Sequence, residues 1–342
     1  MTSARIGAAT GSGFRLDVEF AIEAGITFLY GPHGSGKTTI LDFIAGCARP
    51  DSGRILLEDA ILFDGASAVF VEPNRRRCAY VGERDGLFPR MSVRRNLSFG
   101  AAGSPRLERI RRVSEMAEKF GLGAFETRLP QQTPREMRLR AEIARALLSQ
   151  PKLLLVDDRG IDLAALRILR SAFAGPVVMA CGDLDLCCAA GGRLILLDEG
   201  AIVQSGAARE VVDRPASVGA AKLLGFTNLF EGAITALDPG RGTCRVEFEA
   251  FALDGPYLPG HFRGDRVTVG FASNRLGVLP GDQPRSANRV SANLVSATPG
   301  ARSVRLEFAG GITAEIAQAE FERQKENRNW LVEFPPDAMR AL

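Results

Sequence analysis

The sequence is poor in the residue types that build metal centres and in the apolar runs that build membrane anchors. It contains two histidines, His33 and His261, and six cysteines without a CxxC pair, which argues against a zinc site. We expect the cysteines to be reduced thiols in the core. No run approaches the ~18 apolar residues that span a bilayer, and no apolar signal region follows the N-terminal residues. We therefore expect any link to a membrane to go through a partner protein.

An excess of charge of one sign is also missing. The 43 basic and 40 acidic residues give a net charge of +3, so charge gives no reason to expect nucleic acid as a partner. Hydrophobic residues make up 46% of the 342 residues, which is ordinary for a globular protein. This length favours two or three domains.

The distribution of apolar residues predicts an α/β domain followed by a small all-β domain. Apolar runs at 153–156 and 177–180 are typical of buried parallel strands, and they alternate with helical patterns. After about Gly225, glycine and proline separate short alternating runs, as in a small β-barrel. We therefore predict domains over residues 1–225 and 226–342. Apolar residues also recur at helical spacing and predict an amphipathic helix: Leu107, Ile110, Val113, Met116 and Phe120.

Residues 31–38 match the phosphate-loop pattern G-x-x-x-x-G-K-[ST] and follow an apolar strand candidate at 26–30. Backbone N–H groups in such a loop bind phosphate, the lysine reaches the β- and γ-phosphates, and the final hydroxyl binds Mg²⁺. Asp157 ends an apolar run and is the expected second ligand of that ion. The predicted nucleotide-binding residues are Gly31, Pro32, His33, Gly34, Ser35, Gly36, Lys37, Thr38 and Thr39, with Thr38 and Asp157 at the metal.

The sequence resembles the ABC-transporter ATPase family over nearly its whole length. The likeness is carried by the phosphate loop and by residues 44–55, 73–97 and 143–157, and it is closest to importer subunits for oxyanions such as molybdate. Residues 228–232 and the region from Gly270 resemble the accessory TOBE-like barrel, of the oligonucleotide/oligosaccharide-binding type, that follows the ATPase domain in such importers.

This resemblance implies a fold, cofactors and partners. The fold is an α/β P-loop NTPase (ABC ATPase) domain with a helical subdomain at about 84–150, followed by a small all-β OB-like barrel. The cofactors are ATP and Mg²⁺. The partners are a second ATP-binding subunit, in a homodimer or heterodimer, and a transmembrane permease that contacts Leu87, Phe88 and Pro89. The chain would lie in the cytoplasm, peripheral on the inner face of the cell membrane.

Several family motifs carry other residues in this chain. The candidate catalytic residues are Glu83, at the position of a family glutamine, and Asp158, at the position of a catalytic glutamate. Residues 133–137 replace the signature loop that clamps the γ-phosphate of the opposite subunit, and Gly182 replaces a histidine. Within the replaced signature, Arg135 is either a charge donor to that phosphate or a solvated side chain.

These departures leave two functions open. The chain is either a working ATPase that energises uptake of molybdate or a similar oxyanion, or a regulatory or degenerate subunit that binds nucleotide with little hydrolysis. Losing one transition-state contact commonly costs ~3 kcal/mol, about 100-fold in rate, so we predict impaired turnover with retained Mg-ATP binding. The match at 143–157 disfavours another P-loop class, such as a kinase. Phe14 is either the residue that stacks on adenine or an ordinary core phenylalanine.

Overall fold

The computed structural model describes residues 2–9, 13–82, 86–157, 160–281, 284, 286–300, 303–325 and 329–342. The chain divides into two compact units, Met1–Asp213 and Arg214–Leu342. This division falls before the boundary at 225 and 226 that we expected from the change in sequence texture. The reason is the short helix α8 (Val218–Leu223), which buries Ala220 and Ala221 and contacts the first strand of the second unit.

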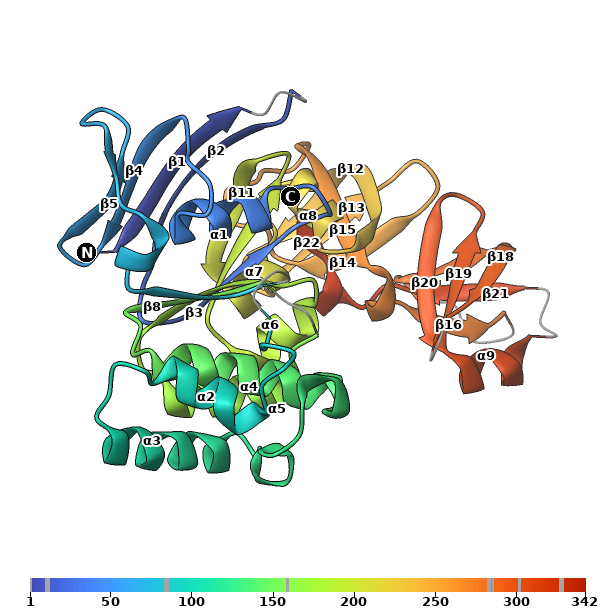
Figure 1. Cartoon of the computed structure of the whole chain (residues 1–342). Coiled ribbons are helices and arrows are strands. Elements are labelled where there is room, and N and C mark those ends of the chain that lie inside the picture. The colour runs from blue at the N-terminus through green and yellow to red at the C-terminus, as the bar shows by residue number, and fades with distance from the viewer. Residues whose placement is uncertain are drawn as a thin grey trace. The chain divides into compact units, whose positions relative to one another are not determined.

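The first unit is built on an eleven-stranded mixed sheet in the order β6-β5-β4-β1-β2-β11-β10-β3-β9-β8-β7 (Figure 1). Five neighbouring strands of this sheet are parallel to one another. Four of them lie inside the sheet and are buried, as their continuous apolar runs predicted, whereas the fifth, β7, is the edge strand. These strands are β3 (Gly25–Tyr30), β7 (Cys78–Val81), β8 (Leu153–Asp157), β9 (Pro176–Ala180) and β10 (Arg193–Asp198). The remaining strands are β1 (Ser3–Ala9), β2 (Arg15–Ala21), β4 (Ser52–Leu57), β5 (Ala60–Asp64), β6 (Val69–Phe70) and β11 (Ala201–Ala207).

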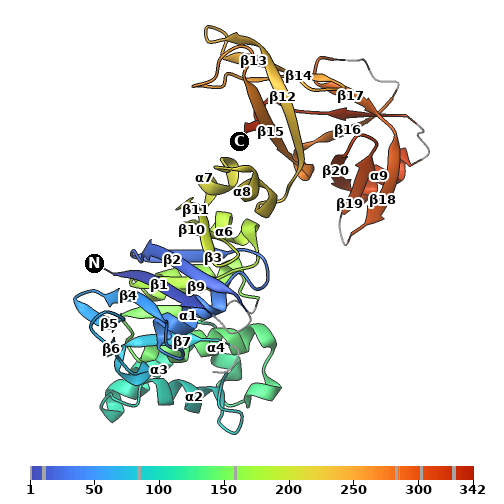
Figure 2. The ribbon, with the colours of Figure 1, turned by 90° about the horizontal axis from the view of Figure 1, so that it is seen from above.

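The helices of the first unit fall into two groups. Helix α1 (Lys37–Ala45) packs against the central strands, and its buried residues belong to the same core as those strands. Helices α2 (Val93–Gly100), α3 (Arg106–Lys119) and α4 (Arg135–Leu148) pack on one another, within the predicted helical subdomain (Figures 1 and 2). The others are α5 (Leu163–Ala172), α6 (Leu184–Ala190) and α7 (Ala208–Asp213), with 3₁₀ turns η1 (Pro73–Arg75), η2 (Gly123–Phe125) and η3 (Pro130–Gln132).

The second unit consists mainly of β-strands, as predicted. Its sheets have the orders β14-β13-β12-β15-β22, β16-β21-β17 and β18-β19-β20. The strands are β12 (Phe226–Asp238), β13 (Thr243–Glu247), β14 (Ala252–Pro256), β15 (Arg266–Ala272), β16 (Gly277–Pro280), β17 (Arg289–Ala292), β18 (Leu294–Pro299), β19 (Ser303–Phe308), β20 (Ile312–Ala317), β21 (Trp330–Glu333) and β22 (Arg340–Ala341). The short elements η4 (Ser273–Arg275), α9 (Gln318–Gln324) and η5 (Pro336–Ala338) connect them. One apolar core, rich in phenylalanine, joins residues of all three sheets.

Candidate functional site

The predicted phosphate loop connects strand β3 to helix α1 at the carboxyl edge of the parallel strands. Gly34 and Gly36 have φ angles of +82° and +100°, in the left-handed region that favours glycine. Gly31 has no room for a side chain, because a Cβ there would lie 2.1 Å from the Leu197 carbonyl oxygen. These three glycines let the loop curl tightly ahead of α1, so that backbone N–H groups and the positive end of the helix dipole meet at one point.

Lys37 closes this loop through its side chain. Its Nζ donates to the Gly31 and Pro32 carbonyl oxygens, both at 2.8 Å, and to Ser35 Oγ at 3.3 Å. Burial lowers the pKa of Lys37, and the nearby Asp157 carboxylate opposes that shift. The ammonium group therefore lies at the loop, beside the backbone that would receive phosphate.

Thr38 and Asp157, the two predicted metal ligands, are in direct contact. The Thr38 hydroxyl on the first turn of α1 donates to Asp157 Oδ2 at the end of β8, over 2.9 Å. The two segments meet because β8, β9 and β3 are neighbouring parallel strands with their carboxyl ends at one edge. A hydroxyl and a carboxylate are hard oxygen ligands of the kind that Mg²⁺ prefers, and both lie at the loop that would hold the phosphates. These residues therefore fit a Mg²⁺–nucleotide complex.

Phe14 lies beside the phosphate loop. A Cβ built on Gly36 would lie 3.1 Å from Phe14 Cζ, and the ring also packs on the core around α1. It lines a hollow of about 560 Å³ next to the loop, together with Gly13, Arg15, Pro32, His33, Gly34, Ser35, Asp198 and Glu199. The position of the ring is therefore compatible with both roles that the sequence left open, which are stacking on adenine and packing in the core.

The two candidate catalytic residues, Glu83 and Asp158, lie outside the described residues. The residues that replace the family signature are described. Pro134 is the N-cap of α4, and the Thr133 hydroxyl donates to the Leu129 carbonyl oxygen at 3.0 Å. The Arg135 guanidinium approaches Gly160, with Nη2 4.0 Å from a Cβ built there. Residue 134 therefore has no N–H to offer a phosphate, and the one hydroxyl at this turn already has an acceptor.

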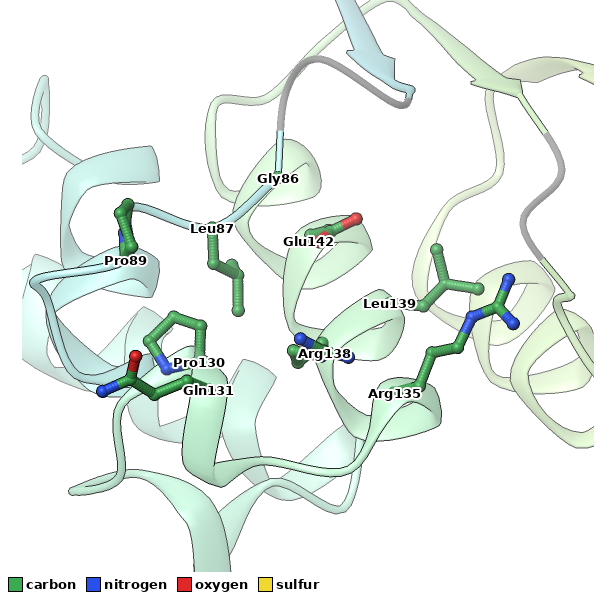
Figure 3. A pocket seen from close by; sticks show the side chains of 9 residues that line it. All are labelled: Gly86, Leu87, Pro89, Pro130, Gln131, Arg135, Arg138, Leu139 and Glu142. Carbon is green, nitrogen blue, oxygen red and sulfur yellow. The ribbon is translucent and has the colours of Figure 1, made fainter.

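A groove of about 330 Å³ lies between the segment before α2 and one face of α4 (Figure 3). Leu87 and Pro89 of the predicted permease-contact segment line one wall. The sequence analysis missed the other wall, although its α4 residues have helical spacing on one face. These lining residues are Arg135, Arg138, Leu139 and Glu142, with Pro130 and Gln131 of η3 beside them.

The segment before α2 is held in place by side-chain bonds to its backbone. The fully buried Asn96 accepts from the Phe88 N–H at 2.7 Å and donates to the carbonyl oxygens of Phe88 and Met91 at 3.2 and 3.1 Å. Arg145 of α4 places its guanidinium carbon 5.1 Å from the centre of the Phe88 ring. The groove wall is therefore fixed to α2 and α4 rather than left as a free loop.

The chain is similar in sequence to a known protein family and to curated proteins. Residues 16–159 match the family model described as ABC transporter. The chain is 35% identical over 210 residues to a protein of Rhodospirillum rubrum named molybdenum import ATP-binding protein ModC, covering 59% of this chain and 57% of that protein. It therefore spans less than two thirds of that relative. A protein of the same name from Paramagnetospirillum magneticum is 32% identical over 258 residues, covering 70% of this chain and 69% of its own length.

Solved structures show the same fold. One described as the structure of the ATP binding subunit of an ABC transporter superposes with a TM-score of 0.54 at 21% sequence identity. The superposition covers 66% of this chain and 99% of the other. At this level of identity the likeness concerns the fold alone, and it agrees with the α/β unit described above.

Proposed function

The chain belongs to the ABC transporter family, and we propose that it is the ATP-binding subunit of an importer for molybdate or a similar oxyanion. The observation that carries ATP binding is the hydrogen bond between Thr38 and Asp157 at the mouth of the phosphate loop. The choice of substrate is supported by the names of the relatives, which are import proteins for molybdenum.

We propose that several groups at the loop share in holding Mg-ATP. The backbone N–H groups of residues 34–38 and the α1 dipole bind the β-phosphate. The Lys37 ammonium exchanges the Gly31 and Pro32 carbonyl oxygens for phosphate oxygens. Thr38 and Asp157 would hold Mg²⁺, whose charge would offset negative charge on the phosphates. Phe14 supplies an apolar face for adenine at the edge of the same hollow.

Membership of the ABC transporter family supports two kinds of partner. None of the helices that the structure describes combines the length and apolar character needed to cross a bilayer. We propose that a transmembrane permease docks in the groove lined by Leu87, Pro89 and the α4 face, with the chain on the cytoplasmic side of the membrane. A second ATP-binding subunit completes the nucleotide site, and the barrel of residues 226–342 is an accessory domain.

A second candidate function is that of a subunit that binds ATP but hydrolyses it slowly. The turn before α4 supports it, because Pro134 lacks an N–H and the Thr133 hydroxyl is bonded to Leu129. Glu83 and Asp158, which stand in place of a family glutamine and a family glutamate, also support slow hydrolysis. An ionised glutamate cannot donate a hydrogen bond, and an aspartate reaches less far than a glutamate. We propose that the chain retains Mg-ATP binding with impaired turnover.

Steady-state ATP hydrolysis by the purified chain with Mg²⁺ tests these proposals, with Lys37→Ala as the background. We expect a rate close to that background, together with measurable Mg-ATP binding by the wild type. A rate far above background would overturn the slow-turnover proposal and leave a working importer ATPase. Absence of Mg-ATP binding would overturn the nucleotide-binding function itself. Uptake of labelled molybdate by cells that carry the wild-type or the Lys37→Ala chain tests the transport role, with labelled sulfate as the comparison.

A further inference from the structure

A buried arginine lies at the end of α1 that is remote from the phosphate loop. Arg76 is 1% exposed, and its Nε donates to the Val71 carbonyl oxygen at 2.6 Å. Its guanidinium carbon lies 4.9 Å from the centre of the Phe70 ring. Burying a guanidinium group costs free energy unless its N–H groups have hydrogen-bond acceptors. The acceptors of Arg76 therefore show which part of the structure it holds in place.

The main acceptors of Arg76 are in the last turn of α1. Its Nη1 donates to the Phe43 and Ile44 carbonyl oxygens at 2.8 and 2.9 Å. Carbonyl groups in the last turn of a helix lack partners within the helix, and a cation there also meets the negative end of the helix dipole. Arg76 therefore acts as a C-terminal cap for α1, supplied by the segment that leads into β7.

Gly46 makes room for this cap. It has a φ angle of +83°, and a Cβ built on it would lie 2.4 Å from Arg76 Nε and 2.6 Å from Cζ. Any side chain at this position would push the guanidinium away from the α1 carbonyl groups. Arg76 and Gly46 thus form one unit at the end of the helix.

Helix α1 has nine residues, so its two ends are about 13 Å apart. A short helix moves as a rigid rod, and a tilt at its C-terminal end displaces the phosphate loop at its N-terminal end. We propose that Arg76 is a positioning residue for the phosphate loop, fixing α1 from behind so that Lys37 and Thr38 are held in the orientation that binds Mg-ATP. This inference depends on the nucleotide binding proposed above.

The first test compares Mg-ATP affinity with thermal stability in Arg76 variants of the full chain. We expect Arg76→Ala to raise the Kd for Mg-ATP about tenfold, measured by titration calorimetry well below Tm. Arg76→Lys keeps the charge but has fewer hydrogen-bond donors. Its Kd should therefore lie between those of the wild type and Arg76→Ala. Phe120→Ala, which truncates a fully buried ring at the end of α3, is the matched control that lowers Tm without changing the Kd. An unchanged Kd in Arg76→Ala, with Tm lowered as in the control, would show that Arg76 only stabilises the fold.

A second test works from the other side of the pair, and its first part needs no Arg76 variant. Gly46→Ala should raise the Kd by a similar factor, because its methyl group displaces the guanidinium. In the double variant Gly46→Ala/Arg76→Ala, the change in binding free energy should be much smaller than the sum of the two single changes, since both substitutions break the same contact. Full additivity would overturn the proposed link between Gly46 and Arg76. If the wild type bound no Mg-ATP at all, the proposed function would fail together with this inference, whereas wild-type binding with unchanged variant affinities would overturn the inference alone.

Discussion

The Thr38 hydroxyl and the Asp157 carboxylate are joined by a 2.9 Å hydrogen bond, although 119 positions separate them in the chain. The bond links the first turn of α1 to the end of β8, and it brings together two oxygen groups of different chemistry. A metal ion that entered with a nucleotide would therefore meet two oxygen groups that are already adjacent. The pairing of β8 with β9 and of β9 with β3 is what maintains this arrangement.

Removing the Thr38 hydroxyl should weaken the metal-dependent part of ATP binding. We expect Thr38→Ala to raise the Kd for ATP about tenfold in the presence of Mg²⁺, because one oxygen ligand is lost, and to change it little in the presence of EDTA. Thr38→Ser keeps the hydroxyl and is the matched control. Titration of each variant with and without Mg²⁺ measures the difference. An equal loss under both conditions would contradict a role for Thr38 at the metal.

Lys37 should contribute to phosphate binding more than to the fold. A charged hydrogen bond contributes about 1.5–3 kcal/mol, so Lys37→Ala should weaken ATP binding by about 10- to 100-fold, while Tm changes little because the side chain is partly exposed. The same titration, paired with thermal unfolding, checks both parts. Lys152→Ala is the control, because Lys152 is ion-paired with Glu58 away from the loop. A large fall in Tm would indicate that the bonds from Lys37 to Gly31 and Pro32 are mainly structural.

The sequence predicts best those features that depend on local pattern. The phosphate loop needs glycines, a lysine and a hydroxyl at fixed spacing, and the structure places that loop between β3 and α1. Helical spacing predicted the α3 helix, and Val113 and Phe120 are indeed buried. The same pattern gave no sign that Leu107 and Ile110 are 83% and 46% exposed, because which turns of α3 are covered depends on where α2 and α4 pack.

Features built from distant segments could not be read from the sequence. Arg76 lies between Arg75 and Arg77, in a run that resembles a solvated surface, and its burial depends on Phe70, Gly46 and the end of α1. The α4 wall of the groove becomes visible only when η3 and the segment before α2 are placed beside it. The expected core thiols are a mixed case: Cys181, Cys187 and Cys244 are buried, whereas Cys47 is exposed. A composition argument cannot distinguish these positions.

The stability of the first unit should depend on pH through Asp162. Desolvation alone would raise the pKa of Asp162, but the hydrogen bond from the Ala165 N–H and the charge of Arg140 outweigh it, so that the pKa is lowered. A lowered carboxyl pKa stabilises the fold above the pKa of the unfolded chain, and that stability is lost as pH falls through the folded pKa. Because the carboxylate is 43% exposed, we expect an effect of only about 0.5 kcal/mol.

Asp162→Asn isolates this charge effect, because asparagine is an equally good N-cap for α5. The variant should be slightly less stable than the wild type at pH 7. The difference should shrink as pH falls below the carboxyl pKa of the unfolded chain and vanish once pH lies below the lowered folded pKa. Asp162→Ala also loses the cap and should remain less stable at every pH, by about 1 kcal/mol. Chemical denaturation across this pH range makes the comparison. A constant difference between wild type and Asp162→Asn would show that the carboxylate charge has no part.

The second unit should depend on one buried amide that bonds to three backbone groups. Asn228 is fully buried on β12, where its Oδ1 accepts from the Thr313 N–H at 2.7 Å and its Nδ2 donates to the carbonyl oxygens of Thr313 and Phe271 at 2.8 and 3.3 Å. It therefore connects β12 to β20 of another sheet, in place of a backbone ladder.

Asn228→Ala leaves these groups buried without partners, at a cost of about 2–4 kcal/mol. The exposed Asn274→Ala is the control and should be neutral. Calorimetry should show a lower Tm for the second unit of Asn228→Ala with unchanged Mg-ATP affinity, because the phosphate loop belongs to the first unit. A parallel loss of nucleotide binding would instead mean that the two units depend on each other for folding.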